Sequence, residues 1–272
     1  MKLSRLFLSG LCFSVLTGAA VAGAAEVSEP AGKGSKEIEV QFVKGENGKK
    51  GFLFGSELSA AIVENNIEKV KEIIKQKPQL INHREEAFQV TPLHEAVSAN
   101  NIEITKILLE NKADANAIDY FNDSPLAIAQ TIEMADLLIK YGADFKVKFK
   151  TGDTIMHKVV SNKKSDPALI DYYEKKGLDI KAKNNEEKTP LMCAAQLDLK
   201  KTEILIQKGA VINEFDQSGW TPLHYAAYAD NLEIAKLLIK NKAVRDAHMP
   251  YRSAPEAFAK SDAMTILLRQ EN

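Results

Sequence analysis

A four-residue motif recurs along this chain at a nearly constant spacing, and it limits the possible folds more than any other feature. The best copies, Thr91–His94 and Thr221–His224, both read Thr-Pro-Leu-His. Successive copies begin 33, 30, 35, 32 and 33 residues apart. A near-fixed period of this length is typical of an array of stacked structural repeats. The copies, of which the last is degenerate, begin at Thr91, Ser124, Thr154, Thr189, Thr221 and Ala254.

Each copy of the motif predicts a pair of helices. Thr or Ser before Pro starts the first helix, because the hydroxyl accepts a hydrogen bond from a free backbone N–H and Pro at the first position loses no needed donor. A second apolar block follows, such as Ile234–Ile239, and most repeats then close on a glycine such as Gly142. Glycine ends a helix in the left-handed conformation. Lys112 and Lys242 occupy two of these glycine positions, where a left-handed lysine costs about 1–2 kcal/mol relative to glycine.

The segments Trp220–Ala227 and Asn231–Leu238 resemble the ankyrin repeat family, whose signature is Thr-Pro-Leu-His-x-Ala at a period of 33 residues. The resemblance covers residues 56–270. It implies an all-α, ankyrin-repeat solenoid of about seven helix-turn-helix units, in which more polar terminal repeats act as caps. We expect the units to begin near residues 56, 86, 119, 149, 184, 216 and 249.

Two neighbouring repeats differ in length from the others. The repeat that begins at Ser124 is short, and we interpret this as the near loss of the loop between its helices, around Thr131–Glu133. The next repeat has residues 161–167 inserted before its second helix, which Ser165 or Asp166 can cap. A short unit beside a long one should disturb the regular curve, either through drift or to shape a groove.

Residues 26–55 precede the array and follow another pattern. Glu26–Lys36 is small and polar, which predicts a flexible lead. Ile38–Phe42 alternates apolar and polar residues, Asn47-Gly48 is a strong turn pair, and Gly51–Phe54 could return as a second strand. Two interpretations stay open: a short β-hairpin or loop that covers the first repeat, or a strand that pairs with a partner.

Residues 1–25 have the pattern of a secretory signal peptide. Two basic residues precede an apolar stretch that is too short for a membrane anchor, and small residues follow it. Cleavage after Ala22, Ala24 or Ala25 fits this pattern equally well. We expect an exported protein, periplasmic or secreted, with no membrane span after cleavage.

Cleavage would also change the charge and the thiol content. The chain has 36 basic and 37 acidic residues, and losing two basic residues and no acidic one takes its net charge from −1 to −3. Cys193 would be the single remaining thiol, so packing must stabilise the fold in place of disulfides. The single Asn-x-Ser sequon is followed by Pro125, and this scarcity of sequons favours a bacterial origin.

No group of residues has the spacing of a catalytic or metal site. His94, His157 and His224 end copies of the motif, and residues one repeat apart stack in a row, whereas zinc ligands converge on one ion at ~2 Å. The ankyrin resemblance implies that this histidine bonds adjacent turns. Cys193 has no histidine or acid at a fixed spacing to activate it. We therefore expect no enzymatic activity, no cofactor and no metal, and the balanced charge argues against a nucleic acid partner.

The ankyrin resemblance also implies a partner surface, usually the concave side made by the turn tips and the exposed face of the first helices. Aromatic residues are enriched in binding hot spots. We predict one aromatic cluster of Phe88, Tyr120 and Phe121 and another of Trp220, Tyr225, Tyr228 and Tyr251. The alternative for Trp220 is packing on the neighbouring turn. The first helices add Glu95, Ser98, Lys158 and Gln196 to this side.

These observations favour a non-catalytic, exported ankyrin repeat protein, expected to be a monomer, that binds a protein partner through its concave surface. One alternative is a periplasmic accessory factor that binds or protects an enzyme, for example a redox or haem enzyme, or that holds a small ligand. A second alternative is a secreted effector directed at a host.

Overall fold

The computed structural model describes residues 42–44, 50–52, 56–247 and 253–269. The expected signal peptide and flexible lead, the Asn47-Gly48 turn pair and Tyr251 lie outside the described residues. The chain divides into two compact units, residues Met1–Phe121 and Asn122–Asn272. We call them unit 1 and unit 2 and describe each by itself.

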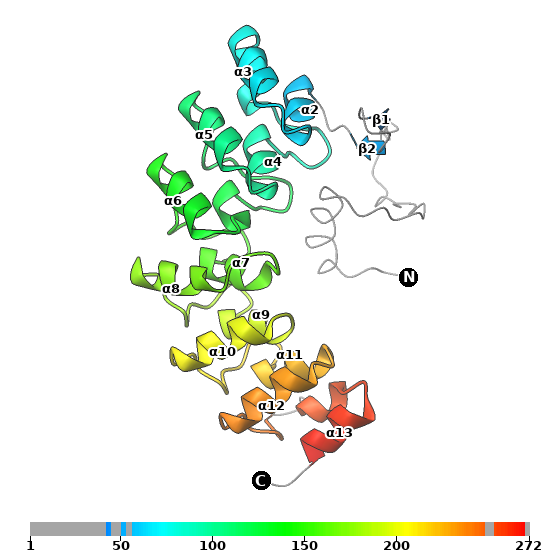
Figure 1. Cartoon of the computed structure of the whole chain (residues 1–272). Coiled ribbons are helices and arrows are strands. Elements are labelled where there is room, and N and C mark those ends of the chain that lie inside the picture. The colour runs from blue at the N-terminus through cyan, green and yellow to red at the C-terminus, as the bar shows by residue number, and fades with distance from the viewer. Residues whose placement is uncertain (1–41, 45–49, 53–55, 248–252, 270–272) are drawn as a thin grey trace, which may run out of the picture. The chain divides into compact units, whose positions relative to one another are not determined.

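The described part of unit 1 contains two helix pairs, in which α2 packs against α4 and α3 against α5 (Figure 1). Two short strands precede them and pair antiparallel, with Val43 opposite Gly51. The elements are β1 (Phe42–Lys44), β2 (Lys50–Phe52), α2 (Glu57–Val63), α3 (Ile67–Gln76), the 3-10 helix η2 (Pro78–Asn82), α4 (Pro92–Ser98) and α5 (Ile102–Glu110).

Five further helix pairs lie in the part of unit 2 that the structure describes. The first helices pack in sequence, η3 against α7, α7 against α9, α9 against α11 and α11 against η4, and the second helices follow the same order. The elements are the 3-10 helices η3 (Pro125–Ile128) and η4 (Pro255–Phe258) and the helices α6 (Ile132–Lys140), α7 (Ile155–Ser161), α8 (Ala168–Lys175), α9 (Pro190–Ala195), α10 (Leu199–Gln207), α11 (Pro222–Tyr228), α12 (Leu232–Lys240) and α13 (Asp262–Arg269). The predicted all-α class and helix-turn-helix repeats are confirmed.

The motif residues start the first helices as predicted. The Ser124 and Thr189 hydroxyls accept hydrogen bonds from backbone N–H groups three residues later, at 3.3 and 3.4 Å. The following proline occupies the first helical turn. The second helices are capped in the same way by short polar side chains, such as Asn101 and Asn231, which accept from N–H groups at 3.0 and 3.2 Å. In these repeats, local side chains therefore fix the helix starts, whereas Ala254 provides no side-chain cap for η4.

The short repeat is explained by its first helix and not by its loop. Three residues, 129–131, join η3 to α6, and three residues, 99–101, join α4 to α5. The difference lies in η3, which has four residues where α4 has seven. Our prediction that the loop is nearly lost was wrong, because the missing residues come from the last turn of the first helix. The long repeat does carry its insertion in the loop, where the Asp166 carboxylate accepts from the Ala168 N–H at 2.8 Å.

The positions that close the repeats are left-handed whether or not glycine occupies them. Gly142 and Gly177 have φ of 92°, and Lys112 and Lys242 have φ of 69° and 71°. A Cβ atom added at Gly142 would meet no atom within 4 Å. The preference for glycine here therefore comes from the backbone conformation and not from lack of space.

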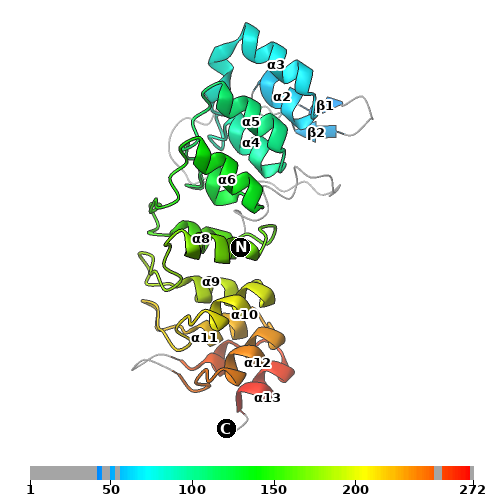
Figure 2. The same ribbon diagram turned by 60° about the vertical axis from the view of Figure 1, so that its left-hand side comes forward.

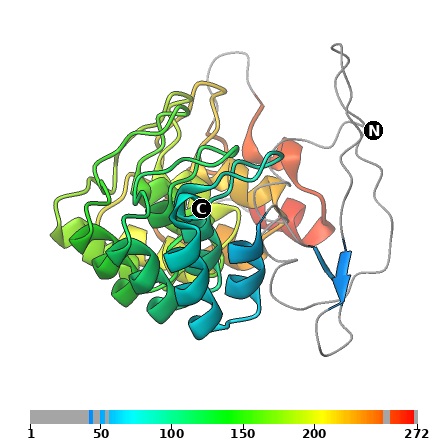
Figure 3. The same ribbon diagram turned by 90° about the horizontal axis from the view of Figure 1, so that it is seen from above.

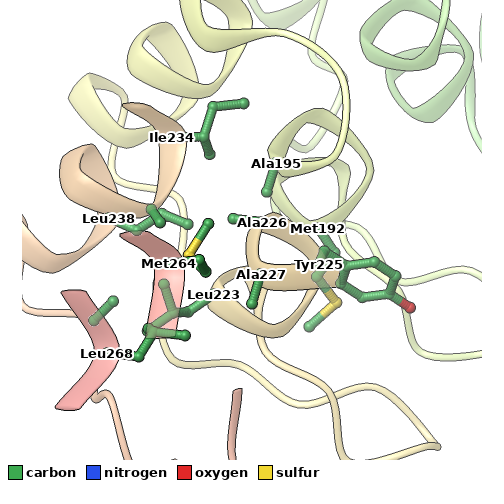
Figure 4. Packing of buried hydrophobic residues seen from close by; sticks show 12 residues of the cluster. Met192, Ala195, Leu223, Tyr225, Ala226, Ala227, Ile234, Leu238, Met264 and Leu268 are labelled. Carbon is green, nitrogen blue, oxygen red and sulfur yellow. The ribbon is translucent and has the colours of Figure 1, made fainter. Parts of the chain in front are cut away.

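The core of unit 2 forms where successive repeats interlock. Figure 4 shows Leu223 of α11 among side chains from the neighbouring helices, including Met264 and Leu268 of α13. Ala226 and Ala227 keep α11 thin on its packed faces, so that the helices on both sides come close. Within each unit, the helices form a layer from which the long turns extend at one side (Figures 2 and 3).

Candidate partner-binding surfaces

The motif histidines hold neighbouring repeats together. In unit 2, the Nδ1 atoms of His157 and His224 accept from the backbone N–H groups of Thr154 and Thr221 at 3.2 and 2.9 Å. Their Nε2 atoms lie 3.0 Å from the carbonyl oxygens of Lys188 and Ser253 in the next repeat. Because a carbonyl only accepts, Nε2 carries the proton and both ring nitrogens are occupied.

Burial lowers the pKa of His157, although the hydrogen bond to the Lys188 carbonyl opposes this. The neutral ring is therefore the form that the fold requires. A histidine whose two nitrogens both serve the fold has no lone pair left for a metal ion.

The three aromatic residues predicted as one cluster in unit 1 do come together. The Phe88 and Phe121 rings are stacked with centroids 5.9 Å apart, and Tyr120 meets Phe121 edge-on at 5.5 Å. The Tyr120 N–H donates to the Phe88 carbonyl at 2.8 Å, which ties the two turn tips together. Tyr120 is 70% exposed. This cluster presents one large, mostly free aromatic ring.

A larger aromatic cluster lies in unit 2 around Trp220. Its ring centroid is 4.5 Å from Phe258, 5.1 Å from Tyr225 and 5.5 Å from Tyr228. Tyr228 is 48% exposed, and the Lys260 ammonium lies 4.4 Å from its ring centroid. Trp220 therefore packs on the neighbouring repeat, as the alternative interpretation expects, and it also supports an exposed aromatic ring, while its role in a partner surface stays a prediction.

Tyr225 takes a different place from the one expected for a contact residue. Only 7% of it is exposed, and its hydroxyl donates to the Asp216 carboxylate at 2.5 Å. The Asp216 carboxylate also accepts from the N–H groups of Ser218 and Trp220, at 2.8 and 2.9 Å. Tyr225 therefore fixes the turn that carries Trp220 and offers little area to a partner.

Other residues expected on this side are also engaged with the fold. The Lys158 ammonium pairs with Asp123 at 2.6 Å and lies 5.1 Å from the ring centroid of Phe149. Ser98 is buried, and Gln196 is half-buried. Of the predicted contact residues that are described, Tyr120 and Tyr228 are the most open to solvent.

Sequence reasoning missed a buried lysine in unit 2. Lys201 on α10 is fully buried, and its ammonium donates to the carbonyls of Val159 and Asn162 at 3.2 and 2.6 Å and to the Ser165 hydroxyl at 2.9 Å. Asp198 lies 3.6 Å away and supplies the opposite charge. The lysine thereby fastens the inserted loop of one repeat to the second helix of the next.

A buried acid in unit 1 has no such set of partners. Burial raises the pKa of Glu95 to about 8, opposed by a hydrogen bond from Ser59 and assisted by the charge of Glu85. Among the described residues, the Glu95 Oε2 atom has no hydrogen-bond partner. The Glu85 carboxylate is itself fixed by the N–H groups of Ala87 and Phe88, at 2.8 and 2.7 Å.

Glu95 lines a groove between the two helix pairs of unit 1. The groove has a volume of about 590 Å³. Its walls come from the end of α2 and from the turn between α4 and α5, and they consist of Ile62, Val63, Asn65, Glu95 and residues 98–102.

Comparison with known proteins places this architecture in a family. The family model described as ankyrin repeats (3 copies) matches residues 58–149, 126–216 and 156–248. The chain belongs to the ankyrin repeat family. Ankyrin repeats generally act as non-catalytic scaffolds that mediate protein–protein interaction.

Relatives of this ankyrin repeat protein differ widely in length. It is 30% identical over 193 residues to the probable 26S proteasome regulatory subunit p28 of Saccharomyces cerevisiae, covering 67% of this chain and 83% of that protein. It is 32% identical over 119 residues to a putative ankyrin repeat protein of Rickettsia bellii, covering 41% of this chain and 33% of that protein.

Two solved ankyrin repeat domains share the fold. The human ASB11 ankyrin repeat domain aligns with a TM-score of 0.66 and 23% identity, covering 80% of this chain and 99% of that domain. The ankyrin repeat domain of Bcl-3 aligns with a TM-score of 0.58 and 22% identity, covering 79% and 99%. At these identities the likeness concerns the fold alone.

Sequence reasoning did not include Phe258 in the cluster around Trp220, and an alignment of the ankyrin repeats shows how it could have been found. Phe258 follows the degenerate motif at the place that Tyr225 takes one repeat earlier. The weakness of the Ala254–Ala257 motif hid this correspondence. A position-by-position alignment would have placed Phe258 beside Trp220.

The remaining searches for chemistry cover the described residues. In them, no three His, Cys, Asp or Glu side chains lie close enough to hold a metal ion together. Burial raises the pKa of the half-buried Cys193 thiol to about 12, so the reactive thiolate is scarce at neutral pH. No described helix combines the length and apolar character that a membrane crossing requires.

Proposed function

We propose that this protein is a non-catalytic, exported ankyrin repeat protein that binds a protein partner through Trp220, Tyr228 and Phe258. We call these three residues the unit 2 aromatic surface. The observation that carries the proposal is the exposed Tyr228 ring, which is held against Trp220 and lies under the Lys260 ammonium. An exposed aromatic ring that is already fixed in place loses little conformational entropy on binding.

Residue type and position both support this surface. Tyr and Trp are enriched in binding hot spots, where large rings with a polar end are buried against a partner. Trp220 lies in a turn tip and Tyr228 at the end of a first helix, which is the side that ankyrin repeats usually present to partners.

Site-specific photo-cross-linking tests the proposal in the organism that makes the protein. A photoreactive amino acid at Tyr228 should give a discrete protein adduct, and adding Trp220→Ala should reduce its yield. The control position is Ile266, which is 59% exposed on α13, a second helix. Equal adducts from both positions, or none from Tyr228, would reject the unit 2 aromatic surface.

The export part of the proposal rests on the signal-peptide pattern of residues 1–25. Cell fractionation with mass spectrometry of the mature N-terminus tests it. We expect a chain that begins after Ala22, Ala24 or Ala25, found in the envelope or the medium. An uncleaved chain in the cytosol would contradict export and would leave the binding proposal standing.

A further inference from the structure

We propose that the groove of unit 1 binds a lysine side chain of a partner polypeptide, with its ammonium against the free carboxyl oxygen of Glu95. The inference rests on the proposed function insofar as the occupant belongs to a protein partner. It concerns a separate surface, however, and it follows from different observations.

The first argument is the missing cation. None of the ion pairs among the described residues includes Glu95, and the charged group that acts on it, Glu85, is acidic. The Ser59 hydroxyl satisfies part of the carboxyl group, and Oε2 is left without a hydrogen bond inside the described structure. A buried acid in this condition is unfavourable for folding. An incoming cation supplies both the charge and the donor that Glu95 lacks.

The second argument is the shape and polarity of the groove. Val63, Ala99 and Ile102 give it apolar walls, and Val63 is 57% exposed. A lysine side chain has a four-carbon stem that packs on apolar surface while its ammonium reaches a polar group. The groove volume of about 590 Å³ accommodates such a stem. The apolar walls therefore match the carbon stem of a lysine side chain, and the Glu95 carboxyl group matches its ammonium.

The single free oxygen favours lysine over other ligands. An arginine guanidinium is best matched by two carboxylate oxygens in a fork, but Ser59 already bonds to this carboxyl group. An anion would be repelled by Glu85 and would supply no counter-charge for the Glu95 carboxylate. A purely apolar ligand would leave Oε2 unpaired and further desolvated.

The test uses the full chain and end-blocked pentapeptides made of four glycines around a central lysine, glutamine or arginine. Binding is followed by chemical-shift changes of the assigned backbone amides. We expect the lysine peptide to shift amides at Val63, Ala99 and Ile102. The glutamine peptide should bind more weakly by about tenfold or more, which corresponds to the loss of one charge-assisted hydrogen bond.

A matched pair of variants assigns the effect to Glu95. Glu95→Gln should weaken lysine-peptide binding by about tenfold or more. Glu103→Gln makes the same substitution at an exposed residue at the start of α5 and should leave binding unchanged. Unaltered binding in Glu95→Gln, equal shifts with the glutamine peptide, or tighter binding of the arginine peptide would overturn the proposal.

The same measurement separates this inference from the proposed function. Tyr228→Ala should leave the lysine-peptide shifts in unit 1 unchanged. If Tyr228 gives cross-links and the groove binds no lysine, the aromatic surface stands and the inference fails. If the groove binds lysine and Tyr228 gives no cross-link, the reverse holds.

Discussion

Two charged groups that lie out of contact with water, the Lys201 ammonium in unit 2 and a carboxyl oxygen of Glu95 in unit 1, are treated in opposite ways. In unit 2, the Lys201 ammonium donates three hydrogen bonds and has Asp198 at 3.6 Å. In unit 1, Glu95 has a hydrogen bond from Ser59 and no described cation. Both side chains have their pKa shifted toward the neutral form by burial, downward for Lys201 and upward for Glu95.

The difference separates a structural charge from a candidate binding group. A buried charge whose donors and acceptors are all matched holds the fold together and leaves nothing for a ligand. A buried acid with a free oxygen beside a groove lowers the stability of the empty protein, and a bound cation would stabilise its ionised form. The comparison therefore predicts opposite signs when each charge is removed.

The largest expected effect is the loss of Lys201. Lys201→Met keeps the volume of the side chain but leaves the Val159 and Asn162 carbonyls short of a donor in a buried site. Removing one partner from such a network should destabilise unit 2 by about 3–5 kcal/mol. Urea unfolding followed by the fluorescence of Trp220, the single tryptophan of the chain and a residue of unit 2, measures this change.

The control for Lys201 is its neighbour on the same helix. The Lys200 side chain is 65% exposed and pairs with Glu203. Lys200→Met should change the unfolding free energy by no more than about 0.5 kcal/mol. Similar losses in both variants would show that Lys201 acts through helix α10 in general and not through the inserted loop.

The next effect has the opposite sign and lies in unit 1. Glu95→Gln removes the ionisable group and should stabilise unit 1 at pH 7 by about 1–3 kcal/mol. The pKa of Glu95 is raised to about 8 from 4.5, so its contribution to stability is present below pH 4.5 and is lost as the pH rises toward 8. The slope in this window should approach about 1.4 kcal/mol per pH unit, because the folded state holds one proton that the unfolded state has lost.

Native-state hydrogen exchange of the α4 amides, measured between pH 5 and pH 8, reports the stability of unit 1. The slope should flatten in Glu95→Gln and persist in Glu103→Gln. A variant that is less stable than the parent at pH 7 would mean that Glu95 has a partner that holds it in place. The contrast between the two buried charges would then disappear.

The sequence predicted the parts of the structure that depend on local chemistry. Helix starts at Ser124 and Thr189, left-handed lysines at 112 and 242, and the grouping of Phe88 with Phe121 all follow from residue types at repeat positions. Residues one period apart have equivalent neighbours, so the position of a residue in a repeat that matches the consensus predicts the position of its equivalents in the other repeats. Such positions can be read without coordinates.

What could not be predicted depends on contacts between repeats of unequal length. Lys201 stands where other repeats have Ile104, Met134, Ile234 and Met264, all fully buried. A lysine at a core position is a signal that alignment could have caught, but its partners lie in the inserted loop of the preceding repeat and at the end of helix α7 before it. The shortened η3 was misread for a related reason, since a three-residue loss can come from a helix or a loop with the same spacing.

The smallest expected effect tests whether the two units differ in their backbones as well as in their buried charges. Lys112 in unit 1 and Lys242 in unit 2 have nearly the same φ, 69° and 71°. Lys112→Gly and Lys242→Gly should each stabilise the protein by about 1 kcal/mol, because glycine adopts this conformation without strain.

Gly142→Ala should destabilise the protein by a similar amount, since the added Cβ meets no atom within 4 Å and only the backbone conformation changes in energy. Urea midpoints measure all three. Equal gains at both lysines would confine the difference between the units to Glu95 and Lys201, whereas a gain in one unit only would show that repeat closure differs as well.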